Sequence, residues 1–283
     1  MMIYIFGANG QLGQSIKKVI PRNIETRFLT SSDLDITDES SLQDFFKSCH
    51  KNDFIINCAA YTAVDNAEKE KDRAFLINAH APKKIAQLCK ENDINLIHIS
   101  TDYIFDGISN TPIKEDQEPN PINTYGASKL EGERGILSSG CKYIIIRTSW
   151  VFSEFGSNFL KTMINLSDRD QLTVVSDQIG SPTYAPDLAS AIIECIQDFD
   201  QCKNEVYHFS NSGKCSWFEF SKAIMESIDA KTKILPTPTS GYPTPAKRPA
   251  YSLLNVSKIE SKGIRIRNWK EALASCIKEL KND

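Results

Sequence analysis

Short runs of apolar residues alternate with longer amphipathic stretches along the first half of the chain. The runs have the length of β-strands, and several are apolar at every position, as in Ile144-Ile145-Ile146. Strands buried on both faces of a parallel sheet require such continuous runs. The pattern therefore predicts a βαβ series with helices on both faces of the sheet. We expect strands near 2–6, 24–29, 53–57, 95–100 and 142–147, and helices near 11–20, 38–49, 71–92 and 124–138.

The alternation of strands and helices ends after about residue 150, where proline-containing loops separate shorter elements. An apolar helix is expected near 187–198, and the apolar run at 206–209 is expected to return to the first sheet. The stretch from Pro236 to Pro249 contains five prolines, which exclude a helix or a central strand there. The chain is therefore expected to form two intertwined lobes with a ligand between them.

A glycine-rich loop follows the first expected strand. Gly7, Gly10 and Gly13 are spaced as G-x-x-G-x-x-G at the junction of a strand and a helix. The first glycine permits a sharp turn, the second lets backbone N–H groups approach a pyrophosphate, and the third lets the helix pack closely. The helix N-terminus adds partial positive charge. In this context the spacing favours a dinucleotide site over a merely tight turn.

These signals together predict an α/β fold with a Rossmann-type doubly wound parallel sheet. We expect a dinucleotide-binding domain over residues 1–150 and a smaller, mainly substrate-binding lobe over 151–283, with about 187–210 returning to the Rossmann sheet. The cofactor's identity stays open. Leu29 is followed by Thr30-Ser31-Ser32 where an NAD-binding protein usually carries an acid, and Asp33 and Asp35 come later. Serines leave room for a 2′-phosphate, but no arginine immediately follows, so NADP(H) and NAD(H) both remain candidates.

Composition restricts the class of partner. The chain has 283 residues, 41% hydrophobic and 24% charged, and a formal net charge of −3, which provides no positive field to gather nucleic acid. Eight cysteines without C-x-x-C spacing argue against a zinc or redox pair and indicate a reducing compartment. Neither a signal peptide nor a membrane span is recognisable, so we expect a cytoplasmic protein that binds neither membranes nor nucleic acid. The four scattered histidines, His50, His80, His98 and His208, are expected to be structural.

Tyr125 and Lys129 form a candidate catalytic pair. They are four residues apart on a helix that Asn123 is expected to cap, so their side chains share one face. A nearby ammonium is expected to lower the tyrosine pKa from about 10, as proton transfer at neutral pH requires. The alternative is an exposed aromatic beside a solvated lysine. Thr101 adds a hydroxyl at the C-terminal end of a predicted strand, the edge where open α/β sheets bind ligands.

Four motifs together resemble the extended short-chain dehydrogenase/reductase family. They are the glycine loop, Asn57-Cys58-Ala59-Ala60, Ser100-Thr101-Asp102 and Tyr125-x-x-x-Lys129. Further segments resemble the branch of this family that reduces the 4-keto group of dTDP-linked deoxy-sugars, and the likeness covers nearly the whole chain. These segments are 60–65, 100–107, 147–152 and 242–249, and the last two lie outside the cofactor half.

The resemblance implies that a nicotinamide delivers hydride to C4 of a nucleotide-linked keto-sugar while Tyr125 supplies the proton to the carbonyl oxygen. Lys129 would steady the phenolate and the nicotinamide ribose, and Thr101 would hydrogen-bond the reacting oxygen. Trp150 would contact the substrate, or else be a core aromatic between the lobes. Arg248 could pair with the diphosphate, or else be an exposed loop cation. The resemblance assigns cofactor contacts to Gly7, Gly10, Gln11, Leu12, Gly13, Asp35, Ile36, Ala60, Tyr61, Thr62, Tyr125 and Lys129, and substrate contacts to Thr101, Asp102, Trp150 and Arg248.

The sequence argues against some of the other activities known in the same family and leaves others open. A dehydratase would carry an acid after Thr101-Asp102, where this chain has Tyr103, and an epimerase needs a second acid/base pair that the sequence does not identify. A reductase of a different deoxy-keto-sugar is the closest rival, and a non-catalytic regulatory subunit would be expected to lose some of the candidate catalytic residues. In some members of the family, carboxylates of the first helix bind a metal ion that links the two subunits of a dimer. The segment Gln14-Ser15-Ile16-Lys17 has none, so we expect no metal, and a homodimer stays open.

Overall fold

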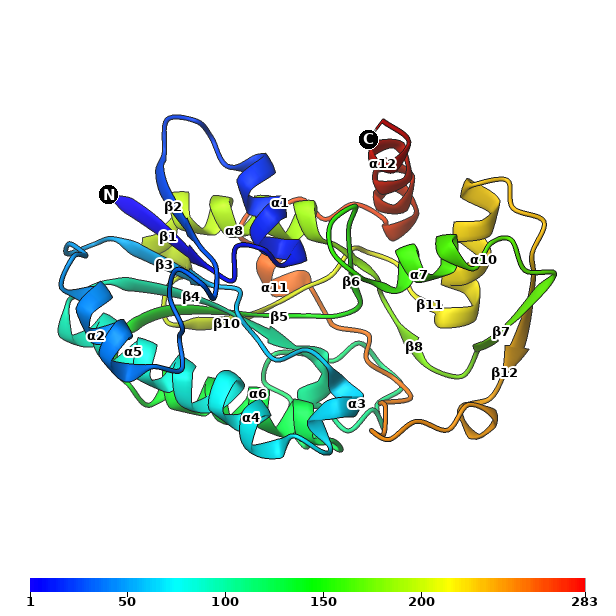
Figure 1. Ribbon diagram of the computed structural model, residues 1–283, viewed down its shortest axis with the longest axis horizontal. Helices are drawn as coiled ribbons and strands as arrows, with labels where there is room; N and C mark the ends of the chain where they lie inside the picture. Colours follow the sequence, from blue (N-terminus) through cyan, green and yellow to red (C-terminus); the bar gives the residue numbers. More distant parts are fainter. Residues whose placement is uncertain (283) are drawn as a thin grey trace.

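A six-stranded parallel sheet forms the centre of the computed structural model, which describes residues 1–282 (Figure 1). The strand order is β10-β5-β4-β3-β1-β2. This confirms the expected Rossmann-type α/β fold, and the apolar run at 206–209 is the edge strand that pairs with β5. The strands of this sheet are β1 (Met2–Phe6), β2 (Glu25–Leu29), β3 (Phe54–Asn57), β4 (Asn95–Thr101), β5 (Lys142–Thr148) and β10 (Glu205–Phe209).

Helices cover both faces of the sheet, and alternate strand residues enter two separate cores. Ile3 and Ile5 of β1 pack on one face, whereas Tyr4 and Phe6 pack on the other. Successive side chains of a strand point to opposite faces, so a strand covered on both sides must be apolar throughout. The first face carries α1 (Gln11–Val19) and α8 (Ala185–Gln197), and the second carries α2 (Glu39–Phe46), α5 (Ala81–Glu91) and α6 (Thr124–Leu137).

The helix expected over 71–92 is interrupted by a wide turn. It consists of α4 (Lys71–Phe75), a π-helical turn η1 (Leu76–His80) and α5 in direct succession. Pro82 has no N–H, so the regular bond back to the carbonyl of Asn78 cannot form. Gly132 of α6 approaches that carbonyl so closely that a Cβ on it would lie 2.1 Å from the oxygen. A short helix that we did not predict, α3 (Val64–Ala67), precedes this segment.

Part of the chain after β5 forms a second lobe around a third apolar core, which includes Phe152, Phe220 and Trp269, whereas α8 and β10 return to the central sheet. In Figure 1 this lobe lies to the right of the sheet. Pro236 lies in β12, which pairs only with β7, so no second neighbour needs its missing N–H. No helix within residues 1–282 is long and apolar enough to cross a bilayer. The remaining elements are η2 (Asp102–Ile104), β6 (Val151–Phe152), α7 (Phe159–Asn165), β7 (Gln171–Val175), β8 (Ile179–Gly180), β9 (Thr183–Tyr184), α9 (Phe199–Cys202), β11 (Cys215–Ser216), α10 (Trp217–Ser227), β12 (Lys233–Thr237), η3 (Thr239–Gly241), α11 (Ser257–Glu260) and α12 (Trp269–Asn282).

Candidate active site

The glycine loop turns tightly between β1 and α1. Gly7 has a φ of +75°, in the left-handed region that favours glycine, and a Cβ there would lie 2.7 Å from the backbone nitrogen of Ala59. A Cβ on Gly13 would lie 2.6 Å from the carbonyl oxygen of Gly7, so this glycine lets α1 close on the loop. Gly10 is the N-cap of α1 and provides no side-chain hydrogen bond to the first turn. The helix N-terminus therefore presents backbone donors suited to a phosphate.

A cavity of about 530 Å³ opens beside this loop. It lies at the ends of β1, β2 and β3, where the strand order reverses between β1 and β3. Open α/β sheets bind ligands at such a point, and the volume is that of a small-molecule site. The predicted cofactor residues Gly7, Gly10, Asp35, Ile36 and Ala60 line the cavity, whereas Leu12, Gly13, Tyr61 and Thr62 belong to the adjoining loops and helix.

Arg73 of α4 brings a cation to this cavity that sequence reasoning missed. It lines the cavity together with Thr30 and Ser31, the hydroxyl residues that follow β2. Its guanidinium lies 5.8 Å from the centroid of the Tyr61 ring and pairs with Glu70 at 3.2 Å. Because Arg73 is distant from β2 in the sequence, no local motif connects the two.

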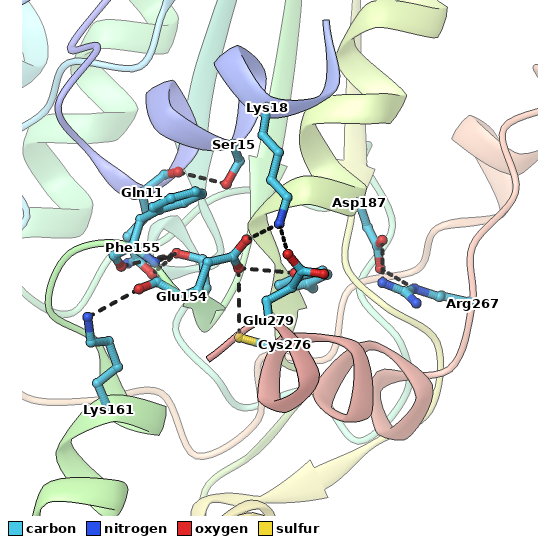
Figure 2. A network of polar contacts seen from close by, with 12 residues as sticks. Gln11, Ser15, Lys18, Glu154, Phe155, Lys161, Asp187, Arg267, Cys276 and Glu279 are labelled. Carbon is cyan, nitrogen blue, oxygen red and sulfur yellow. Dashed lines mark hydrogen bonds and ion pairs between the residues drawn. The ribbon is translucent and has the colours of Figure 1, made fainter. Parts of the chain in front are cut away.

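The side chain of Gln11 is not part of the cavity lining and hydrogen-bonds the second lobe; Figure 2 shows Gln11 beside Phe155 and Glu154. Its Oε1 accepts hydrogen bonds from Ser153 Oγ at 3.0 Å and Asn158 Nδ2 at 2.8 Å. Beside it, the buried Glu154 accepts a bond from Lys18 of α1 at 2.7 Å, and Figure 2 shows this carboxylate between α1 and α12. The Gln11 side chain is therefore occupied by the second lobe, which leaves its backbone N–H, at the start of α1, as the group available to a ligand of the glycine loop.

Tyr125 and Lys129 lie in the first turns of α6, and both contact the end of β4. Asn123 caps the helix as predicted, its Oδ1 accepting a bond from a backbone N–H of the first turn at 2.8 Å. Lys129 Nζ donates to the carbonyl oxygen of Ile99 at 2.6 Å, and Tyr125 lies beside Thr101, whose side chain acts to lower the pKa of the Tyr125 hydroxyl. The structure thus brings the three candidate catalytic residues together at one edge of the sheet.

Burial dominates the pKa values of this pair. It raises the pKa of Tyr125 to about 12, against the opposing effect of the Thr101 hydrogen bond, and it lowers the pKa of Lys129 to about 8. The expectation that Lys129 lowers the pKa of Tyr125 is therefore wrong in this structure. The reason is that the ammonium is turned toward β4, where it meets Ile99 and His98.

Asp102 follows Thr101 and is also buried. Its Oδ1 accepts a hydrogen bond from Thr101 Oγ1 at 3.1 Å, and Oδ2 has no partner within residues 1–282. Burial raises the pKa of Asp102 to about 7, against the hydrogen bonds that lower it. A carboxyl that is part protonated at neutral pH can donate a hydrogen bond as well as accept one, which suits contact with a polar ligand such as a sugar.

Trp150 stacks on Trp217, with ring centroids 3.6 Å apart and an interplanar angle of 11°. Its backbone φ is +47°, a conformation that is costly for a bulky residue and that the surrounding structure must impose. Trp217 begins α10 and was not identified from the sequence. The stacked pair is part-buried at the margin of the third core, so Trp150 has features of both the substrate-contact and the core interpretation.

Arg248 is held by a carboxylate rather than free in its loop. Its two terminal nitrogens donate to the Asp65 oxygens at 3.0 and 2.7 Å, and this pairing lowers the pKa of Asp65. Asp65 belongs to α3, in the half of the chain that supplies most strands of the central sheet. The ion pair therefore fastens the proline-rich loop to that half, and a diphosphate would have to share the guanidinium with Asp65.

Two further buried residues hold the site, and sequence reasoning assigned neither to it. Asn78 of η1 accepts a bond from the backbone N–H of Tyr61 at 2.8 Å and donates to Ser128 Oγ at 3.0 Å. His98, expected to be structural, lies with its Nε2 3.3 Å from Lys129 Nζ. Within residues 1–282, no cluster of three or more histidine, cysteine or acidic side chains is arranged to hold a metal.

Known proteins match nearly the whole chain. The family model described as RmlD substrate binding domain matches residues 1–282. The spore coat polysaccharide biosynthesis protein SpsK of Bacillus subtilis is 42% identical, over 98% of this chain and 97% of that protein. A dTDP-4-dehydrorhamnose reductase structure from Clostridium acetobutylicum has a TM-score of 0.95 and 41% identity, covering 99% of this chain and 100% of that one. A structure of the Bacillus anthracis dTDP-4-dehydrorhamnose reductase in complex with NADP has a TM-score of 0.94 and 39% identity, covering 98% and 99%.

Proposed function

This chain belongs to the RmlD substrate binding domain family, and we propose that it uses NAD(P)H to reduce the C4 ketone of dTDP-4-dehydro-L-rhamnose to dTDP-L-rhamnose, for cell-surface polysaccharide synthesis. One observation carries the proposal. Thr101, Tyr125 and Lys129 gather at the end of β4, on the same edge of the sheet as the cavity beside the glycine loop, although none of the three lines that cavity. The names of the similar reductases and the NADP complex of one of them support the same choice.

Each candidate catalytic residue has a role that its environment supports. The nicotinamide cofactor, when bound, supplies the hydride. Burial keeps Tyr125 protonated at neutral pH, which is the state required of the group that gives a proton to the carbonyl oxygen. The Thr101 hydroxyl donates to Asp102 in the structure and can turn its one proton to the same carbonyl oxygen when the ketone is bound. Lys129 carries a positive charge at neutral pH, and because its ammonium is turned to Ile99 rather than to the phenol, we assign it to the nicotinamide ribose.

We also propose that NADPH is preferred over NADH, because Arg73 lines the cavity together with Thr30 and Ser31. A guanidinium and two hydroxyls match the oxygens of a 2′-phosphate. In Arg73→Ala the KM for NADPH should rise roughly tenfold, as expected for one lost charge-assisted hydrogen bond, while the KM for NADH stays near its original value. Lys71→Ala, which removes a cation of α4 that does not line the cavity, is the control. An equal change for both cofactors in Arg73→Ala would contradict this role.

Turnover with a panel of nucleotide-linked 4-keto-sugars tests the substrate. Purified protein should oxidise the cofactor fastest with dTDP-4-dehydro-L-rhamnose. Faster oxidation with another member of the panel would favour a reductase of a different deoxy-sugar. Interconversion of sugars without net cofactor oxidation would favour an epimerase, and no reaction with any sugar would favour a regulatory subunit.

We further propose a cytoplasmic location, in keeping with eight cysteines that are all free in the structure. A homodimer is a separate proposal, and sedimentation of the purified protein would test it. A sedimentation coefficient that corresponds to the 31.8 kDa monomer would rule the homodimer out.

A further inference from the structure

We propose that two buried residues, Asn57 and His98, govern whether Lys129 carries a proton. They do so by fixing which nitrogen of His98 carries its proton, and they act on the reduction only through Lys129. The inference rests on the proposed function for its catalytic meaning. The hydrogen-bond arrangement on which it is built is a property of the fold, and it can be measured without turnover.

The three side chains form a continuous polar chain beneath the active site. Lys129 Nζ lies 3.3 Å from His98 Nε2, and Asn57 Nδ2 lies 3.2 Å from His98 Nδ1. All three residues are no more than 2% exposed. In the parallel pairing of β3 with β4, Asn57 is the register partner of His98. The sheet itself therefore sets this contact.

The backbone determines which way the Asn57 amide points. Its Oδ1 accepts a hydrogen bond from the backbone N–H of Ala59 at 3.2 Å, so its NH₂ group is turned to the imidazole. An NH₂ group can only donate, and His98 Nδ1 must therefore accept and carry no proton. A neutral imidazole then holds its single proton on Nε2, the atom that faces Lys129.

His98 stays neutral at physiological pH. Burial and the neighbouring charge of Lys129 both hold the pKa of His98 well below its ordinary value. The imidazolium form, which would carry protons on both nitrogens, is thereby excluded at neutral pH.

An N–H on Nε2 suits a neutral amine better than an ammonium. The amine of Lys129 can accept this bond through its lone pair and still donate to Ile99 O, which leaves every partner in the buried chain satisfied. The ammonium has no lone pair and cannot accept this bond. Either its own N–H then faces the N–H of His98 Nε2, or the imidazole proton moves to Nδ1, which leaves the NH₂ group of Asn57 without an acceptor. The pair therefore favours release of a proton from Lys129.

Other groups around Lys129 act on the same equilibrium. Burial lowers the pKa of Lys129 to about 8, while Glu133 on α6 and Cys58 after β3 act to raise it. Glu133 is itself paired with Arg147 of β5 at 2.8 Å, so much of its charge is already balanced. The Asn57–His98 pair adds directional hydrogen bonding to these contributions.

This arrangement fits the proton balance of the reduction. Tyr125 loses a proton to the carbonyl oxygen and must regain one before the next turnover. The pKa of Tyr125 is about 12 and that of Lys129 about 8, so the ammonium is the more acidic group and can be the source of that proton without itself touching the phenol. The N–H of His98 then stabilises the amine that remains, and water returns a proton to Lys129.

Nitrogen-15 NMR of protein labelled at its histidines tests the arrangement in the unaltered chain. The His98 signal, assigned by its loss in His98→Asn, should show a protonated Nε2 and an unprotonated Nδ1 from about pH 5 to pH 8. A proton on Nδ1, or an imidazolium that titrates near pH 6.5, would overturn the proposal. Because the spectrum does not depend on turnover, failure of the proposed function would be seen separately.

Asn57→Asp tests the coupling to Lys129. The carboxylate still accepts from Ala59, but it also accepts from His98, so the imidazole proton should move to Nδ1 and Nε2 should become an acceptor for the ammonium. The alkaline limb of kcat/KM should then move upward by about one pH unit. Asn95→Asp, at the start of β4 and also buried, is the matched control and should leave the limb in place. A switched tautomer with an unmoved or lowered limb would overturn the proposal.

Discussion

Replacing Asp102 with asparagine should change how the stability of the protein depends on pH. The pKa of Asp102 is about 7 in the folded protein, whereas an aspartate in an unfolded chain titrates near 3.9. This difference of about three pH units corresponds to roughly 4 kcal/mol at 1.36 kcal/mol per unit. Between about pH 4 and pH 7 the folded state binds this proton more tightly than the unfolded state. The free energy of unfolding therefore falls as the pH rises through that window.

The asparagine variant isolates this effect because it is close in shape and does not titrate. Its amide oxygen can still accept the bond from Thr101. Urea unfolding of both proteins, followed by tryptophan fluorescence in a series of buffers, gives the difference between their free energies of unfolding. That difference, original protein minus variant, should fall by about 1.4 kcal/mol per pH unit between about pH 4 and pH 7 and then level off.

Asp38→Asn is a control for which the free-energy difference should change with pH in the opposite direction. This exposed carboxylate caps α2, and hydrogen bonds from Ser41 and Ser40 lower its pKa, so its stabilising contribution is lost as the pH falls. In Asp38→Asn the difference should therefore slope the other way. A flat difference for Asp102→Asn would mean that its carboxyl titrates alike in the folded and unfolded chains, and the argument from burial would fail.

Three further substitutions test other parts of the structure. Tyr125→Phe should reduce turnover by roughly 10²–10⁴ through loss of the acid, with cofactor affinity retained in a fluorescence titration, and unchanged turnover would refute its role. Glu133→Gln leaves the buried Arg147 without its carboxylate and should lower the free energy of unfolding by about 3–5 kcal/mol, measured in urea. A loss below about 1 kcal/mol would show that the pair is not a buried ion pair in solution. Asp65→Asn frees Arg248 and should speed limited proteolysis of the loop 242–249, whereas an unchanged cleavage rate would mean that other contacts hold that loop.

The sheet was predictable because its signal is local and repeated. An apolar run such as Ile144-Ile145-Ile146 is costly anywhere except in a strand covered on both faces, and it forms part of β5. The interruption of the long helix at η1 was not predictable, since it depends on the approach of Gly132 from α6 as well as on Pro82. The two-residue strands of the second lobe, such as β6 and β9, are too short to show any periodicity.

Some residues of the candidate site could likewise be predicted from the sequence, and others could not. Local spacing was enough to identify the glycine loop and the Tyr125–Lys129 pair, because each occupies a single turn or helix. Arg73 and His98 reach the site only through the packing of distant segments, so no spacing rule finds them. The pKa of Tyr125 was wrongly expected to fall, since a single sequence shows that a lysine is near but not where its ammonium points or how deeply the phenol is buried.

Transfer of a labelled hydride tests the central claim most directly. Purified protein is mixed with dTDP-4-dehydro-L-rhamnose and NADPH that carries deuterium at both C4 positions of the nicotinamide, and the sugar product is analysed by NMR and mass spectrometry. The account predicts dTDP-L-rhamnose with one deuterium on C4 of the sugar and an unlabelled proton on its new hydroxyl. Unreacted keto-sugar, or deuterium at any other carbon, would contradict it.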